Sequence, residues 1–131
     1  DMEATPLTSE EEGIALLGGA WLGGQKGVLL MQSSGVGNCI NMLSLTNTCR
    51  FPLLTLVTMR GEWAEFNPWQ GPMSKATKSS LENMGVQSFR VEDDVDVAPT
   101  VDAVATQVFA GDQAAAILLG QKLIGKKEWS R

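Results

Sequence analysis

The sequence predicts an α/β fold, in which helices cover both faces of a parallel sheet. Segments at 27–32, 51–59, 86–91 and 114–119 are short and rich in apolar residues, and LLTLV and AAAILL are nearly or fully apolar runs. Such runs are typical of strands buried on both faces, and the alternation of strands with helices favours parallel pairing. At 131 residues, 44% hydrophobic and 19% charged, the chain has the size and composition of one globular domain spanning 1–131.

The first expected helix covers residues 10–23. Ser9 stands three residues before Glu12, which is the spacing of a capping box, and the acidic first turn suits the positive end of a helix dipole. Gly18 and Gly19 lower the helix propensity of this segment. We therefore expect another part of the protein to approach this helix closely.

Further helices are expected at 38–45, at 75–84 and after a cap at Thr100, and a polar basic tail begins at Gln121. A tight turn at 33–37 would connect the first apolar run to the second helix. On this pattern the chain starts at what would be the second strand of the sheet. We therefore expect a leading strand and helix, together about 30 residues, to be missing or disordered.

The composition excludes several classes of function. The chain has no histidine, which excludes Ser–His–Asp hydrolases, Cys–His proteases and the usual His-ligated zinc sites. A net charge of −5 and a pI near 4.6 argue against a nucleic-acid partner. With no apolar run near the ~20 residues of a bilayer span and no signal peptide, we expect a cytoplasmic protein without a membrane partner. Cys39 and Cys49 are expected to be reduced thiols of the core.

Ligands of open parallel sheets bind beyond the carboxyl ends of the strands, which makes the loops there the first candidates. The Gly35-Val36-Gly37 segment follows an apolar run and lacks side chains that would keep a ligand from the backbone. A plain strand-to-helix turn would use the same residues. A Rossmann fingerprint would need a third glycine where Ile40 stands.

Three consecutive glutamates open the first helix, and at most one of them can face a cleft. Successive helical residues point ~100° apart, and capping accounts for Glu12, so Glu10 or Glu11 is the candidate for acid–base chemistry. The alternative is a solvated first helical turn.

The segment 60–72 has no periodicity and contains two tryptophans, one phenylalanine and two prolines, which favours a pocket or an interface. Arg60 opens this segment at the end of a strand, where it could bind an anion bidentately or form a surface salt bridge. The acidic segment 92–96 matches no calcium loop, so no metal site is predicted.

Several of these segments resemble the pyrimidine-binding (PYR) domain of thiamine-diphosphate (ThDP) enzymes. SEEEGI at 9–14 with GAWLGG at 19–24 is similar to the segment around their catalytic glutamate, which stands nine residues before a glycine, as Glu10 does before Gly19. LMQSSGVGN at 30–38 is similar to the MQNSGLGN of sulfopyruvate and phosphonopyruvate decarboxylases. PLL at 52–54 and MRG at 59–61 resemble the next strand and loop of sulfopyruvate decarboxylases. The resemblance runs from about Thr8 to Gly85, and more loosely to the end.

This resemblance implies a flavodoxin-like, three-layer PYR domain that lacks its first strand and helix. It also implies an alpha subunit of a ThDP-dependent 2-oxo acid decarboxylase that acts on sulfopyruvate or a similar anionic substrate. Glu10 would contact the aminopyrimidine ring and activate the cofactor. The residues that would help to bind the cofactor are Ser34, Gly35, Gly37 and Asn38. Arg60, with Gln70 as a neutral donor, would hold the second anionic group of the substrate.

The family's Gly-Asp-Gly…Asn motif, which holds Mg²⁺ and diphosphate, does not occur in the sequence. The resemblance therefore implies a pyrophosphate-domain beta subunit that binds the Mg²⁺, and a chain that is inactive alone. Self-association of PYR domains is expected too. The small residues Gly13, Gly18, Gly19 and Ala20 and the aromatic loop Trp63–Trp69 are expected to form the partner surface.

Two alternatives to this function are kept. One is a component of a phosphonopyruvate decarboxylase-like enzyme. The other is a non-catalytic nucleotide-binding or interaction module of flavodoxin-like fold, because a fold does not determine a function.

Overall fold

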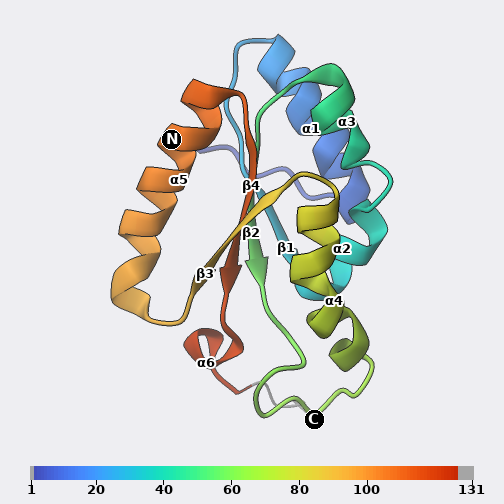
Figure 1. The fold of residues 1–131 in the computed structure, drawn as a ribbon, viewed down its shortest axis with the longest axis vertical. Helices are drawn as coiled ribbons and strands as arrows, with labels where there is room; N and C mark the ends of the chain where they lie inside the picture. Colours follow the sequence, from blue (N-terminus) through green and yellow to red (C-terminus); the bar gives the residue numbers. More distant parts are fainter. Residues whose placement is uncertain (1, 127–131) are drawn as a thin grey trace.

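The computed structural model describes residues 2–126, and each predicted strand is present in it. The strands are β1 (Leu29–Gln32), β2 (Leu53–Thr58), β3 (Gln87–Val91) and β4 (Ala114–Leu119). All neighbouring strands pair in parallel, in the order β1-β2-β4-β3. The predicted fold class, a parallel sheet with helices on both faces, is confirmed (Figure 1).

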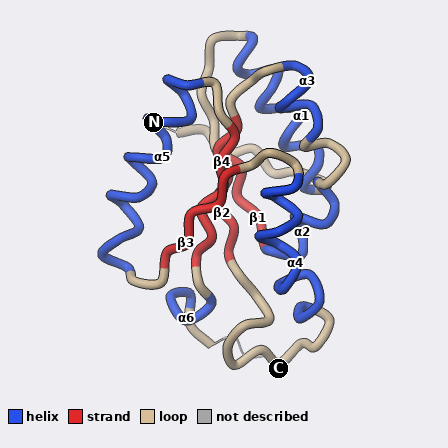
Figure 2. The backbone as a smooth tube through the Cα atoms, viewed as in Figure 1, coloured by secondary structure: helices blue, strands red, loops and turns tan. Residues whose placement is uncertain are grey.

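The helices form two outer layers (Figure 1). One face of the sheet is covered by α1 (Glu10–Leu22), α2 (Ser33–Cys39), α3 (Ser44–Cys49) and α4 (Gln70–Asn83), and the other by α5 (Val97–Gly111). A 3-10 turn, η1 (Asp94–Asp96), precedes α5, and a single turn, α6 (Gln121–Ile124), follows β4. The segments that follow β2 and β4 leave the sheet at the same end (Figure 2).

Successive side chains of β2 point to opposite faces of the sheet, so they pack in different parts of the core. Leu53 and Val57 belong to the cluster formed with α1, α2 and α4, whereas Leu54 belongs to the cluster under α5. All three side chains are buried. The four apolar residues among the six of β2 therefore reflect a strand packed on both faces.

The tight turn predicted at 33–37 is wrong. Helix α2 begins at Ser33 directly after β1, so Gly35 and Gly37 lie within a helix, and the helix expected at 38–45 is replaced by α2 and α3. Glycine costs roughly 1 kcal/mol in a helix interior, which favoured a turn on local grounds. Both glycines instead permit close contacts with other helices, described below, and this tertiary packing decides the local structure.

Two helices begin earlier than predicted. Helix α4 begins at Gln70 rather than at 75, and α5 begins at Val97 rather than after Thr100. Each has a proline in its first turn, Pro72 or Pro99, where the missing N–H would have had no intrahelical partner. The polar tail expected from Gln121 begins with α6, and residues 127–131 lie outside the described range.

Helix α1 is confirmed, but its capping differs from the prediction. The Ser9 side chain makes no cap hydrogen bond, and the Glu12 carboxylate accepts instead from the backbone N–H of Thr8 at 2.8 Å. A Cβ at Gly18 would lie 3.2 Å from the Phe51 ring, so the close approach expected at this helix is made by the chain itself.

The partner surface expected on the glycines of α1 is therefore wrong in part. A Cβ at Gly13 would collide with Leu29, and Gly18 packs on Phe51, so both glycines serve internal packing. Gly19 has open space where its Cβ would be.

Both cysteines are free, but only Cys39 is buried. Cys49 ends α3 and is exposed, so the expected core position is wrong for that residue. In the described part of the chain, no helix is both long and apolar enough to cross a bilayer.

Candidate functional site

Glu10 and Asn38 meet beyond the carboxyl end of β1. Glu10 is the first residue of α1, and Asn38 lies in α2, which follows β1 directly. The Asn38 Nδ2 amide donates a hydrogen bond of 2.9 Å to Glu10 Oε2. The structure thus brings together two of the residues that the sequence analysis placed at the cofactor.

Gly35 lies against the Glu10 carboxyl group. A Cβ at this position would lie 2.6 Å from both Cδ and Oε1 of Glu10, closer than real Cβ contacts. The missing side chain therefore lets the carboxyl group lie against the backbone of α2. The close approach that the sequence analysis expected of a ligand at Gly35 is also needed by Glu10 itself.

The two oxygens of the Glu10 carboxyl group have different surroundings. Oε2 accepts from Asn38, whereas Oε1 has no hydrogen-bond donor within residues 2–126. The residue is half-buried. One oxygen is thus fixed by the protein and the other can bond to a ligand.

The neighbouring glutamates are placed differently. Glu12 accepts from the backbone of Thr8, and Oε2 of Glu11 is buried without a hydrogen-bond partner in the described residues. Burial, followed by the negative charges of Glu10 and Glu11, raises the pKa of Cys39 to about 12. This thiol is therefore protonated at physiological pH and is a poor nucleophile. Glu10 is the glutamate that reaches the glycine segment.

The rest of the glycine segment is packed against other elements. A Cβ at Gly37 would lie 3.2 Å from Met73 Sδ in α4, and Ser34 is half-buried. Ser33, which was not predicted as a site residue, is fully buried, and its Oγ accepts from the Arg60 backbone N–H at 3.1 Å. Ser33 therefore connects the start of α2 to the end of β2.

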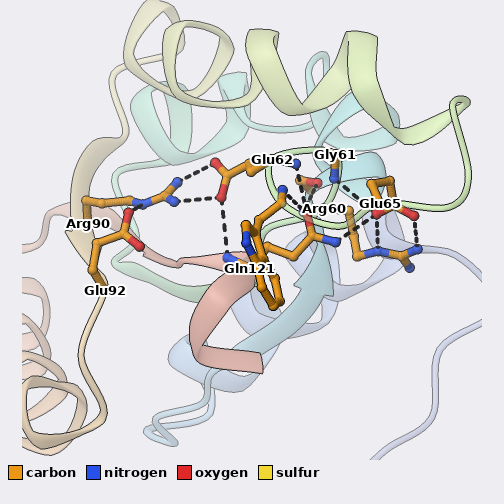
Figure 3. Close-up of polar contacts among 9 residues, drawn as sticks. Arg60, Gly61, Glu62, Glu65, Arg90, Glu92 and Gln121 are labelled. Atoms are coloured by element: carbon orange, nitrogen blue, oxygen red, sulfur yellow. Dashed lines mark hydrogen bonds and ion pairs between the residues drawn. The ribbon is translucent and has the colours of Figure 1, made fainter. Parts of the chain in front are cut away.

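Arg60 forms a buried ion pair (Figure 3). Its Nε and Nη2 donate to the two oxygens of Glu65, each at 2.7 Å, and the two side chains are only 7% and 9% exposed. The guanidinium also lies 5.7 Å from the centre of the Phe66 ring. From the sequence, Arg60 was proposed to bind an anion or to form a surface salt bridge. An ion pair buried inside the protein was not among these proposals.

Gln121, which was not predicted as a site residue, belongs to a hydrogen-bond network with Glu65 and the start of the aromatic loop. It is 2% exposed, donates to Glu65 Oε2 at 2.9 Å and accepts from the backbone N–H groups of Glu62 and Trp63. Its position two residues after the carboxyl end of β4, where loops of α/β sheets carry function, was the available signal. Figure 3 shows these hydrogen bonds, which join the segment that follows β2 to Gln121 beyond β4.

Gln70 is not part of that network. It opens α4 and is 9% exposed, and its Oε1 has no hydrogen-bond partner in the described residues. Its side chain makes no hydrogen bond to Arg60, so the two predicted substrate residues are not joined directly.

The buried pair predicts an acid sensitivity of the fold. The hydrogen bonds from Arg60, with those from the backbone of Asn67 and Gly61 and from Gln121, lower the pKa of Glu65 to about 2. A lowered pKa stabilises the fold above the ordinary carboxyl value near 4.5, and this contribution, on the order of 3 kcal/mol, is lost as the pH falls towards 2. Urea unfolding measured across this range should show the loss, and it should be largely absent in Glu65→Gln.

No family model matches the chain. Over 90 residues it is 43% identical to the "Sulfopyruvate decarboxylase subunit alpha" of Methanococcus maripaludis, a match covering 68% of this chain and 54% of that relative. The chain is related to sulfopyruvate decarboxylase alpha subunits. It spans about half the length of the alpha subunits that it matches, with 54%, 51% and 47% of their lengths covered.

Two further relatives extend the comparison beyond the alpha subunits. The chain is 33% identical over 118 residues to the "Sulfopyruvate decarboxylase" of Methanosarcina acetivorans, covering 89% of this chain and 30% of that protein. It is also 34% identical over 99 residues to the "Phosphonopyruvate decarboxylase" of Streptomyces viridochromogenes, covering 74% of this chain and 25% of that protein. The resemblance to the sulfopyruvate and phosphonopyruvate decarboxylases is confirmed.

The structure shows no metal-binding cluster in the described part of the chain. Among residues 2–126, no three His, Cys, Asp or Glu side chains are grouped so that they could hold a metal ion.

Proposed function

We propose that the chain is the PYR part of a ThDP-dependent decarboxylase of anionic 2-oxo acids, sulfopyruvate or a close analogue. It acts with a pyrophosphate-domain subunit that binds the Mg²⁺. The observation that carries the proposal is the Glu10 carboxyl group, held by Asn38 against Gly35 with one oxygen left for a ligand. The names of the relatives support the reaction class and the division into subunits.

The residues present fit the aminopyrimidine part of ThDP. A carboxyl group with a free oxygen can form a hydrogen bond to a ring nitrogen and share its proton. The glycine at position 35 makes room for the carboxyl group against α2, where a Cβ would take its place. When bound, the cofactor supplies the electron-accepting thiazolium chemistry that the side chains of a protein do not provide.

The chain's own part in the reaction is to hold and move a proton. Glu10 Oε1 would exchange a proton with the aminopyrimidine while Oε2 stays bonded to Asn38. The buried Arg60–Glu65 pair and Gln121 would keep the neighbouring loop fixed and help to exclude water. Ser34 and Gly37 are proposed to lie along the cofactor, as the family resemblance implies.

The proposed function is tested by reconstitution. The chain, a pyrophosphate-domain subunit, ThDP and Mg²⁺ are combined, and CO₂ release from sulfopyruvate, phosphonopyruvate and pyruvate is followed. We expect release only when all four components are present, fastest with a substrate that carries a second anion. A non-catalytic interaction module would give no release with any substrate, and faster turnover of phosphonopyruvate would favour the alternative named by the Streptomyces relatives.

Gly35→Ala is expected to lower the turnover without lowering the stability of the fold. Alanine suits a helix interior better than glycine by roughly 0.5–1 kcal/mol, so the melting temperature should not fall. The added Cβ would displace the Glu10 carboxyl group, and turnover should fall at least about tenfold, since small misplacements of catalytic groups are costly. Gly19→Ala, also in a helix but with open space around its Cβ, is the control and should melt no lower than the unmodified chain. Unchanged turnover in Gly35→Ala would show that Glu10 need not lie against α2.

Arg60→Lys tests whether Arg60 binds the substrate or only the loop. Both forked nitrogens of Arg60 already bond Glu65, and a lysine ammonium cannot replace that fork. We therefore expect turnover of sulfopyruvate and of pyruvate to fall by similar factors. A clearly larger loss with sulfopyruvate would support the anion-binding role that was predicted from the sequence.

A further inference from the structure

The Glu10 carboxylate is held by a neutral group. No lysine or arginine forms an ion pair with Glu10 within residues 2–126, and the hydrogen-bond partner of its carboxylate in this part of the chain is the Asn38 amide, 28 residues away in sequence. A glutamate side chain has three rotatable bonds, so a half-buried carboxyl group needs such a partner to keep one orientation.

The neutrality of that partner has a chemical consequence. A cation beside a carboxylate favours the ionised form and opposes uptake of a proton, as the Arg60 guanidinium does at Glu65. An amide donor instead orients one oxygen and adds no charge. It therefore suits a carboxyl group that must both take up and release a proton.

We propose that Asn38 is a positioning residue that holds Glu10 and does not itself bind the cofactor. The proposal rests on the proposed function, and it replaces the cofactor-binding role that the family resemblance implied for Asn38. The Asn38 amide bonds Oε2, and the orientation of the carboxyl plane that this imposes directs Oε1 to the ligand. Gly35 completes the arrangement, because a Cβ there would occupy the space of the carboxyl group.

The hydrogen bond can be tested without cofactor or partner. In the 131-residue chain, the side-chain amide resonance of Asn38 is followed by NMR from neutral to acid pH. We expect this resonance to shift with a single carboxyl titration that disappears in Glu10→Gln and remains in Glu11→Gln. A resonance that does not titrate, or a titration that survives Glu10→Gln, would overturn the proposal.

The functional consequence is tested in the reconstituted complex with Asn38→Asp and Asn38→Ala. Asn38→Asp keeps the size of the side chain but replaces the donor by a charge that repels Glu10. We expect kcat to fall about 10- to 100-fold in both variants, as misplaced catalytic groups do. The half-saturating ThDP concentration should stay within about twofold, and the melting temperature should be unchanged.

Asn41→Asp and Asn41→Ala are the matched controls, because Asn41 is an exposed asparagine just beyond α2 with no side-chain contact to Glu10. Both should retain full kcat. A weaker affinity for ThDP at unchanged kcat would make Asn38 a cofactor ligand and overturn the proposal, as would full activity of Asn38→Ala. If the unmodified complex shows no decarboxylation, the proposed function fails, and the amide titration still decides whether Asn38 holds Glu10.

Discussion

Glu10→Gln is expected to lower the turnover of the reconstituted complex by about 10²- to 10⁴-fold, the range that a lost acid–base group typically gives. Glutamine keeps the shape of the side chain and can still bond Asn38, but it cannot carry a proton to or from a ligand. The melting temperature should therefore stay unchanged. CO₂ release and thermal melting, measured on the same preparations, check both parts.

Glu11→Gln and Glu12→Gln are the controls for that result. The three atoms nearest to a Cβ at Gly35 all belong to Glu10, whereas the Glu12 carboxylate accepts from the Thr8 backbone N–H and one Glu11 oxygen is buried without a hydrogen-bond partner in the described residues. Both variants should keep most of the activity, and Glu12→Gln is expected to cost at most about 1 kcal/mol of stability through the weakened cap. An inactive Glu11→Gln variant together with an active Glu10→Gln variant would show that Glu11, and not Glu10, is the activating residue.

Glu65→Gln is expected to cost about 3–5 kcal/mol of unfolding free energy. The Arg60 guanidinium would stay buried without its charged partner, which is the costly way to break a buried ion pair. Urea unfolding of the variant checks the size of the effect. Replacing both partners, Arg60→Met with Glu65→Leu, should recover much of the loss because no buried charge remains.

The matched control is Glu62→Gln, which weakens the ion pair between Glu62 and Arg90. Those two side chains are 25% and 36% exposed, and a pair so open to solvent contributes at most about 1 kcal/mol. Equal, small losses in Glu65→Gln and Glu62→Gln would show that the Arg60–Glu65 pair does not secure the aromatic loop.

The strands were predictable because their signal is local. A run such as AAAILL at 114–119 is buried on both faces, and it becomes β4 with the predicted bounds. The start of α2 was not predictable in this way, because Gly35 is explained by the carboxyl group of Glu10, which is 25 positions earlier in the sequence and approaches only in the folded chain.

The site residues also divide into those that the sequence indicates and those that only tertiary contacts explain. Glu10 could be selected from the sequence through capping geometry and the family motif, and the structure places it against the glycine segment. The network around Arg60 could not be selected, because Glu65 comes from an aperiodic loop and Gln121 lies two residues beyond the last strand. Buried polar networks of this kind depend on tertiary geometry that no local pattern contains.

The most direct test of the account is the exchange of the thiazolium C2 proton of ThDP bound to the reconstituted complex, followed in D₂O by NMR after acid quench. This measurement needs no substrate, so it reports on the Glu10 carboxyl group and the cofactor alone. We expect fast exchange in the unmodified complex and exchange slowed to nearly the rate of free ThDP in Glu10→Gln, with Glu11→Gln unaffected. Equally fast exchange in Glu10→Gln would contradict the claim that Glu10 activates the cofactor.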